Sequence, residues 1–181
     1  MQTISRSTCI LAILFLPASV TGAEMPDPLA SGEILVGTVH IQYLHAQGAQ
    51  VYECKVGASG KLAWYFREPI ATLLVGGRTV GRHYAGPNWE LDDGSAITGK
   101  VLGSTPGATP KDIPLLKLEV VARHGAGGLA DVTTIERINT KDGVAEGPCQ
   151  TAGAFLSMPY SADYAFYKKT RWSLIPHTKA E

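Results

Sequence analysis

Residues 116–123 read Leu-Lys-Leu-Glu-Val-Val-Ala-Arg, with an apolar residue at every second position. Successive side chains of an extended chain point to opposite faces, so Leu116 and Leu118 share one side while Lys117 and Glu119 share the other. This period of two predicts a β-strand with one buried face. The stretch therefore indicates a fold in which sheets, rather than helices, enclose the core.

The same strand character recurs along the rest of the chain, which contains no convincing helical stripe. The other strand-like runs are Ile34–Tyr43, Tyr52–Val56, Leu62–Phe66, Ile70–Val75, Thr79–Tyr84, Ile97–Leu102, Val132–Asn139 and Tyr160–Phe166. Turn signals separate many of them, such as Gly76-Gly77, Asp93-Gly94 and Asp142-Gly143. About nine short strands without intervening helices predict an all-β fold, an antiparallel sandwich or barrel.

Composition excludes two broad classes of protein. Of 181 residues, 45% are hydrophobic and only 18% are charged, which is too apolar for a disordered chain. The 16 basic and 16 acidic side chains balance. Nucleic acid is therefore not an expected partner, because binding to phosphates requires a surplus of positive charge.

The first 23 residues have the three parts of a secretory signal peptide. Arg6 is the only charged residue, residues 9–16 are all apolar, and Thr21-Gly22-Ala23 offers the small side chains that signal peptidase requires. The apolar run is about half the length needed to cross a bilayer. We expect cleavage after Ala23, leaving a single secreted β domain over residues 24–181, periplasmic or extracellular, with no membrane span.

Cleavage would leave two of the three cysteines, Cys54 and Cys149. An even pair in an oxidising compartment normally forms a disulfide bond. The alternatives are two free buried thiols or a redox pair, although redox cysteines usually lie close together in sequence. We predict one structural disulfide.

Residues 81–94 combine unusual side chains around a turn and read Gly-Arg-His-Tyr-Ala-Gly-Pro-Asn-Trp-Glu-Leu-Asp-Asp-Gly. They resemble the signature G-x-H-Y-A-G-P-x-W-E of a secreted bacterial and fungal family known as domain of unknown function 3455. Further matching segments lie at residues 48–54, 64–66, 68–73, 99–101, 113–119, 147–149 and 159–164. One departure is Pro148, where the family usually has glycine before its second cysteine.

The resemblance implies secretion, an all-β domain and the pairing of Cys54 with Cys149, but no settled activity. Some members look to have been labelled malate dehydrogenase. Such an enzyme needs a glycine-rich turn between a strand and a helix inside a parallel sheet. The sequence has no such signature, and no cofactor is expected.

Four residues of the signature, His83, Tyr84, Trp89 and Glu90, are the candidate functional residues. In the architectural interpretation they build a tight corner, with buried aromatic rings that need polar partners. In the binding interpretation they form an aromatic platform beside a carboxylate and an imidazole for a small molecule or glycan. We predict a structural or small-molecule/glycan-binding module.

The alternative is a hydrolase in which Glu90 acts with Asp92 or His83 as acid and base. Glu90 and Asp92 would lie on one face of an extended segment, roughly 6 to 7 Å apart. No nucleophile elbow accompanies them. The histidines and acids also show no metal-ligand cluster, so no metal site is predicted.

Overall fold

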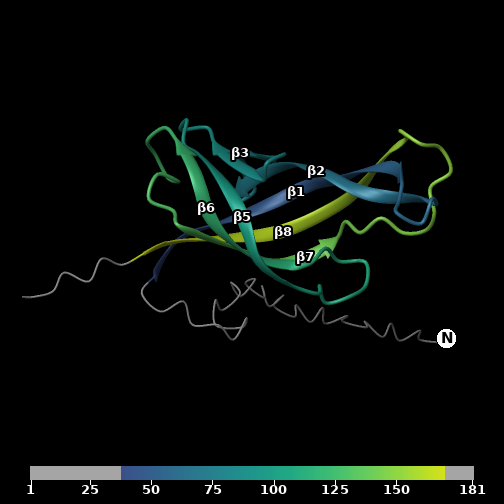
Figure 1. Cartoon of the computed structure of the whole chain (residues 1–181). Helices are drawn as coiled ribbons and strands as arrows, with labels where there is room; N and C mark the ends of the chain where they lie inside the picture. The colour runs from purple at the N-terminus through teal and green to yellow at the C-terminus, as the bar shows by residue number, and fades with distance from the viewer. Residues whose placement is uncertain (1–37, 170–181) are drawn as a thin grey trace, which may run out of the picture. The chain divides into compact units, whose positions relative to one another are not determined.

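The computed structural model describes residues 38–169, so the predicted signal peptide at residues 1–23 lies outside the described residues. The described part contains eight strands and no helix. The strands are β1 (Thr38–Val56), β2 (Leu62–Val75), β3 (Arg78–Tyr84), β4 (Asn88–Leu91), β5 (Ala96–Thr105), β6 (Leu115–His124), β7 (Thr134–Asp142) and β8 (Phe155–Lys169) (Figure 1). No helix in residues 38–169 has the length and apolar character to span a membrane.

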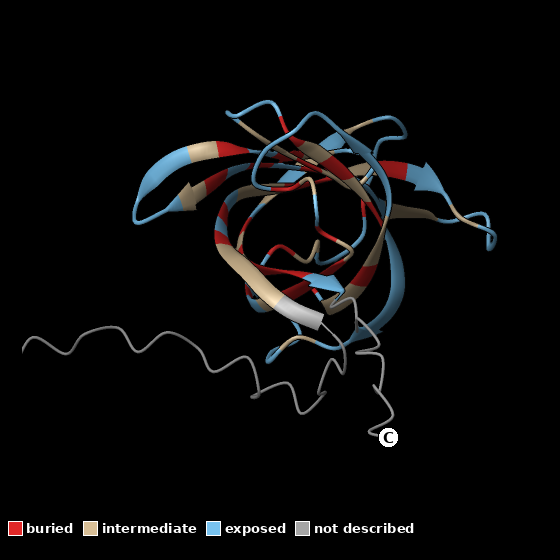
Figure 2. Ribbon diagram, turned by 90° about the vertical axis from the view of Figure 1, so that its left-hand side faces the viewer, coloured by how far each residue is buried: buried red, intermediate tan, exposed pale blue. Residues whose placement is uncertain are grey.

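Each strand pairs antiparallel with the next one in sequence, and β8 pairs with β1, so the sheet closes into a barrel. Figure 2 shows the strands forming a ring, with buried segments on strands all around it. The all-β antiparallel prediction is confirmed, and the structure selects the barrel over the sandwich. Closure pairs both lateral edges of the sheet, which removes the free edges of an open sheet.

The number of strands differs slightly from the predicted nine. Tyr52–Val56 continues the first predicted strand within β1, and Leu62–Phe66 joins Ile70–Val75 in β2. β4 was not predicted, because four residues between two turns carry too little pattern. The glycine inside β1 does not end the strand: a Cβ atom on Gly48 would come within 2.1 Å of the carbonyl oxygen of Ile70, so glycine lets β1 and β2 approach closely.

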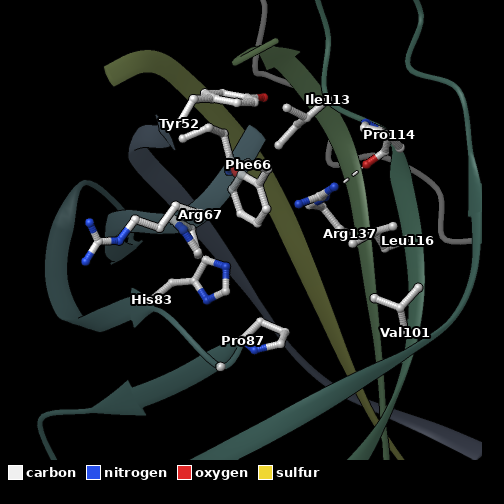
Figure 3. A pocket seen from close by; sticks show the side chains of 13 residues that line it. Tyr52, Phe66, Arg67, His83, Pro87, Val101, Ile113, Pro114, Leu116 and Arg137 are labelled. Atoms are coloured by element: carbon white, nitrogen blue, oxygen red, sulfur yellow. Dashed lines mark hydrogen bonds between the residues drawn. The ribbon is translucent and has the colours of Figure 1, made fainter. Parts of the chain in front are cut away.

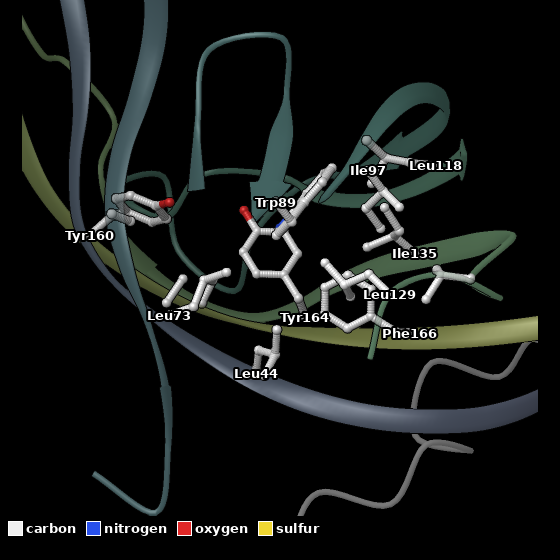
Figure 4. Close-up of a cluster of buried hydrophobic side chains, with 14 of the residues drawn as sticks. Leu44, Leu73, Trp89, Ile97, Leu118, Leu129, Ile135, Tyr160, Tyr164 and Phe166 are labelled. Atoms are coloured by element: carbon white, nitrogen blue, oxygen red, sulfur yellow. The ribbon is translucent and has the colours of Figure 1, made fainter. Parts of the chain in front are cut away.

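The apolar core fills the inside of the barrel and is formed mainly by alternate residues of the strands, with Leu129 and Val132 added from the segment between β6 and β7. Trp89 is 1% exposed and packs edge-on against Tyr164 and Phe166, with ring centroids 5.1 and 6.3 Å away (Figure 4). The other large members of this core are Leu44, Leu73, Ile97, Leu118, Leu129, Val132 and Ile135. These inward-facing positions include Leu118, from the stretch that first indicated the fold.

A disulfide joins Cys54 in β1 to Cys149 in the segment between β7 and β8. Both cysteines are buried. The predicted pairing is therefore confirmed, and it links segments 95 residues apart in the sequence.

Candidate functional site

The β3–β4 hairpin divides the four predicted site residues between the two faces of the sheet. His83 in β3 is the register partner of Trp89 in β4, and both side chains point into the barrel, where they are buried. Tyr84 and Glu90 follow them in the sequence and lie on the outer face. The structure therefore brings together two pairs, not one cluster of four.

On the inner face, the ring of His83 stacks on Trp89 with centroids 4.5 Å apart and planes 16° apart. Its Nδ1 lies 2.8 Å from the carbonyl oxygen of Asn88. A carbonyl can only accept, so Nδ1 carries the proton and donates it. Burial lowers the pKa of His83 to about 4, and the imidazole is therefore neutral at pH 7. Its Nε2 is then a hydrogen-bond acceptor.

On the outer face, Glu90 accepts hydrogen bonds from the hydroxyl of Tyr84 and the guanidinium of Arg82, each at 2.9 Å from Oε2. These two bonds, Tyr84 first and Arg82 second, hold the pKa of the Glu90 carboxyl below its usual value. The guanidinium also lies 5.0 Å from the centre of the Tyr84 ring. Glu90 is thus an ionised and partnered carboxylate.

This geometry gives little support to a hydrolytic pair. His83 and Glu90 lie on opposite faces of the same hairpin, so they do not face a common substrate. Asp92 is exposed and follows the end of β4 in a turn, where its backbone N–H donates to the carbonyl of Val80. On the outer face, Arg82 and Glu90 form an ion pair beside the ring of Tyr84.

A cavity of about 550 Å³ is lined by His83 of the hairpin, and six of the eight strands contribute to its lining (Figure 3). The lining residues are Gln50, Tyr52, Phe66, Arg67, Pro69, His83, Gly86, Pro87, Val101, Ile113, Pro114, Leu116 and Arg137. Buried residues such as Gln50, His83 and Ile113 form its floor, while exposed residues such as Phe66 and Val101 form its rim. This volume is typical of small-molecule sites.

Five polar side chains lie together at and below this floor, and we call Gln50, His83, Arg137, Tyr160 and Tyr164 the polar layer. The hydroxyls of Tyr160 and Tyr164 and Nε2 of Gln50 are buried without a hydrogen bond of good geometry in the described part of the chain. The ring of Tyr164 lies 5.1 Å from that of His83. Burial raises the pKa of both tyrosines, so their hydroxyls remain protonated and able to donate.

Sequence reasoning missed Arg137, Gln50 and the tyrosines of the polar layer as site residues. A signal was present for Arg137: it lies two positions after Ile135, so both face the same side of β7. An arginine on the apolar face of a strand is unusual enough to mark a site. The pattern alone does not show which groups lie opposite it, and this depends on closure of the barrel.

Two glycines, Gly81 and Gly99, allow close packing around the β3–β4 hairpin. A Cβ atom on Gly99 would come within 2.9 Å of the Trp89 ring, and one on Gly81 within 2.1 Å of the carbonyl oxygen of Glu90. Both glycines therefore support the placement of Trp89 and His83. Among residues 38–169, no group of three or more histidine, cysteine or acidic side chains is arranged to hold a metal ion.

Comparison with known proteins adds a family but no activity. The family model described as "Protein of unknown function (DUF3455)" matches residues 37–77 and 75–168. No curated protein matches the chain, and no solved structure does. The match extends over all strands of the barrel, from β1 to β8, apart from the last residue of β8. The chain therefore belongs to the DUF3455 family of proteins of unknown function.

Proposed function

We propose that this protein binds a small molecule in the cavity lined by His83 and the β3–β4 turn. The observation that carries the proposal is a cavity of about 550 Å³ with apolar and aromatic walls and with Gln50 in its floor, where the buried amide nitrogen of Gln50 has no hydrogen bond of good geometry in the described part of the chain. Buried polar atoms are normally hydrogen-bonded, and leaving one unpaired costs about 1–3 kcal/mol. A ligand that pairs with them would recover part of this cost.

The proposal places the protein outside the cytoplasm, after cleavage of the signal peptide at Ala23. The buried Cys54–Cys149 disulfide supports this location, because disulfides persist in oxidising compartments.

The test is a screen of small organic acids, amines, alcohols and sugars on the mature protein, with thermal stabilisation as the first readout and calorimetry as the second. Two matched variants locate the site. Val101 lines the cavity, whereas Val121 does not, and both are about half exposed (48% and 54%). We expect Val101→Trp to abolish binding by filling the cavity, and Val121→Trp to leave it unchanged.

Two results would contradict the proposal. One is the absence of any compound that stabilises the wild-type protein. The other is a compound that binds Val101→Trp as tightly as it binds the wild type, which would locate its site elsewhere on the surface.

A further inference from the structure

Among the described residues that line the cavity, Arg137 is the one buried arginine or lysine, and its environment is unusual for an arginine. It is 9% exposed, and its Nε–H donates to the carbonyl oxygen of Pro114 over 2.9 Å (Figure 3). This bond uses one of the five N–H groups of the guanidinium. None of the carboxylates in residues 38–169 forms an ion pair with it.

The guanidinium of Arg137 carries a fixed positive charge. A buried charge without a counter-ion is costly, so buried arginines are normally paired with an acid. Arg137 acts electrostatically on the groups around it: its charge opposes the burial effect on the pKa of Tyr160 and Tyr164 and adds to the lowering of the pKa of His83. The floor of the cavity is therefore positively charged.

No residue lining the cavity supplies the missing negative charge. The lining contains two arginines and no aspartate or glutamate. The second, Arg67, lies at the exposed rim and is already paired with Glu68 over 3.1 Å. His83 is neutral, and the amide N–H₂ of Gln50 can only donate. The floor thus offers a fixed cation and hydrogen-bond donors.

The walls indicate what the rest of a ligand contains. Tyr52 and Phe66 form an edge-to-face pair with centroids 5.8 Å apart, and Val101, Ile113 and Leu116 add aliphatic surface. These residues favour a ring or a hydrocarbon chain. A neutral sugar fits less well, because sugar hydroxyls are usually bound by carboxylates, and the lining contains none.

We propose that the ligand is an organic anion, a carboxylate with an aromatic or aliphatic body, whose carboxylate pairs with the guanidinium of Arg137. The inference rests on the proposed binding function and adds the charge class of the ligand. Two parallel hydrogen bonds from the guanidinium suit the two oxygens of a carboxylate. The polar layer supplies further donors, and the walls cover the body of the ligand.

The test compares acids with neutral analogues of the same shape. The probes are naphthalene-2-carboxylate with naphthalene-2-carboxamide, and decanoate with decanol, measured by calorimetry on the mature protein at pH 7.5. We expect each acid to bind the wild type at least about tenfold more tightly than its neutral partner. Arg137→Met, which keeps much of the side-chain volume, should abolish this preference, and Arg137→Lys should retain part of it. Arg78→Met, at an exposed position of β3 that does not line the cavity, serves as the control and should keep the preference.

The outcomes separate the two proposals. If neither member of a pair binds and the wider screen also finds no ligand, the binding function itself fails. If the neutral members or neutral sugars bind as tightly as the acids, the binding function stands and the anion inference is overturned. A preference for acids that persists in Arg137→Met also overturns it. Should Arg137→Met fail to fold, the affinity for each acid is divided by the affinity for its neutral analogue in the wild type and in Arg137→Lys. A ratio near one in the wild type, or an undiminished ratio in Arg137→Lys, overturns the anion inference.

Discussion

His83 illustrates how one side chain can be both a core residue and a candidate ligand contact. Its ring is held by Trp89 on one face, and its Nδ1–H is used by the carbonyl of Asn88. Only Nε2, on the other edge of the imidazole, is left to contact a ligand, and His83 lines the cavity. The neutral state is imposed by burial, and it makes the stability of the barrel depend on pH.

We expect wild-type stability to fall as the pH drops from about 6.5 toward 4. The unfolded chain takes up a proton at His83 near pH 6.5, whereas in the folded protein burial lowers the pKa of this residue to about 4. Protonation therefore favours unfolding between these values and has no effect above them. The full difference is about 3 kcal/mol. The measurement is the free energy of unfolding in urea at pH 7.5 and 4.5.

His83→Gln is the comparison protein, because its side chain does not titrate and all other groups are common to both proteins. Its stability should decline less than that of the wild type over the same interval. Equal declines in the two proteins would show that His83 is not held neutral in the folded state.

At this scale the sequence marked residues 83–90 as a candidate site but did not predict their arrangement. Adjacent residues of a strand face opposite sides, so His83 and Tyr84 cannot belong to one cluster, and the period of two already implied this. The pairing of His83 with Trp89 depends on where the turn between them begins. Arg137 is far from His83 in sequence, and its proximity to that residue follows only from closure of the barrel.

Among the elements, β1 and β2 show how local sequence and close packing interact. Gly48 lies inside β1 opposite Ala71, and its missing side chain lets the two backbones come together. Strand periodicity predicted the separate pieces of both strands. Their continuity across Gly48 and Pro69 could not be predicted, because both residue types usually indicate a break and only the tertiary contact explains them here.

Gly48→Ala should destabilise the barrel by about 1–3 kcal/mol, because a Cβ atom would lie 2.1 Å from the carbonyl oxygen of Ile70 and 2.5 Å from the Cα of Ala71. The backbone atoms of the paired strands cannot move away without a cost in the free energy of the folded state. Gly103→Ala in β5 is the matched control, since nothing lies within 4 Å of the added atom. Urea unfolding of both variants tests this, and equal midpoints would show that β1 and β2 can separate without cost.

For the molecule as a whole, the disulfide and the closure of the sheet are the two long-range constraints. Cys54–Cys149 encloses most of the barrel sequence. Pairing could be predicted from the number of cysteines and the expected compartment. A closed barrel could not be distinguished from a sandwich, because the same alternating strands satisfy both and only the pairing of the first strand with the last decides between them.

Replacing both cysteines by alanine should lower the free energy of unfolding by about 4 kcal/mol, because the crosslink restricts a long loop in the unfolded chain. Alanine avoids placing two hydroxyl groups at these buried positions. Wild-type protein treated with dithiothreitol should approach the stability of the double variant. Two free thiols in the native protein, found by titration without reductant, would rule out the crosslink.

The pairing of β1 with β8 sets Thr38 opposite Lys169, so the two ends of the barrel segment are neighbours. A circularly permuted chain, with β8 joined to β1 and new termini at Gly76-Gly77, would contain the same eight strands in the same order around the ring. The cavity draws on six strands and on no single stretch of chain. Its chemistry is therefore a property of the ring itself and is independent of where the polypeptide starts.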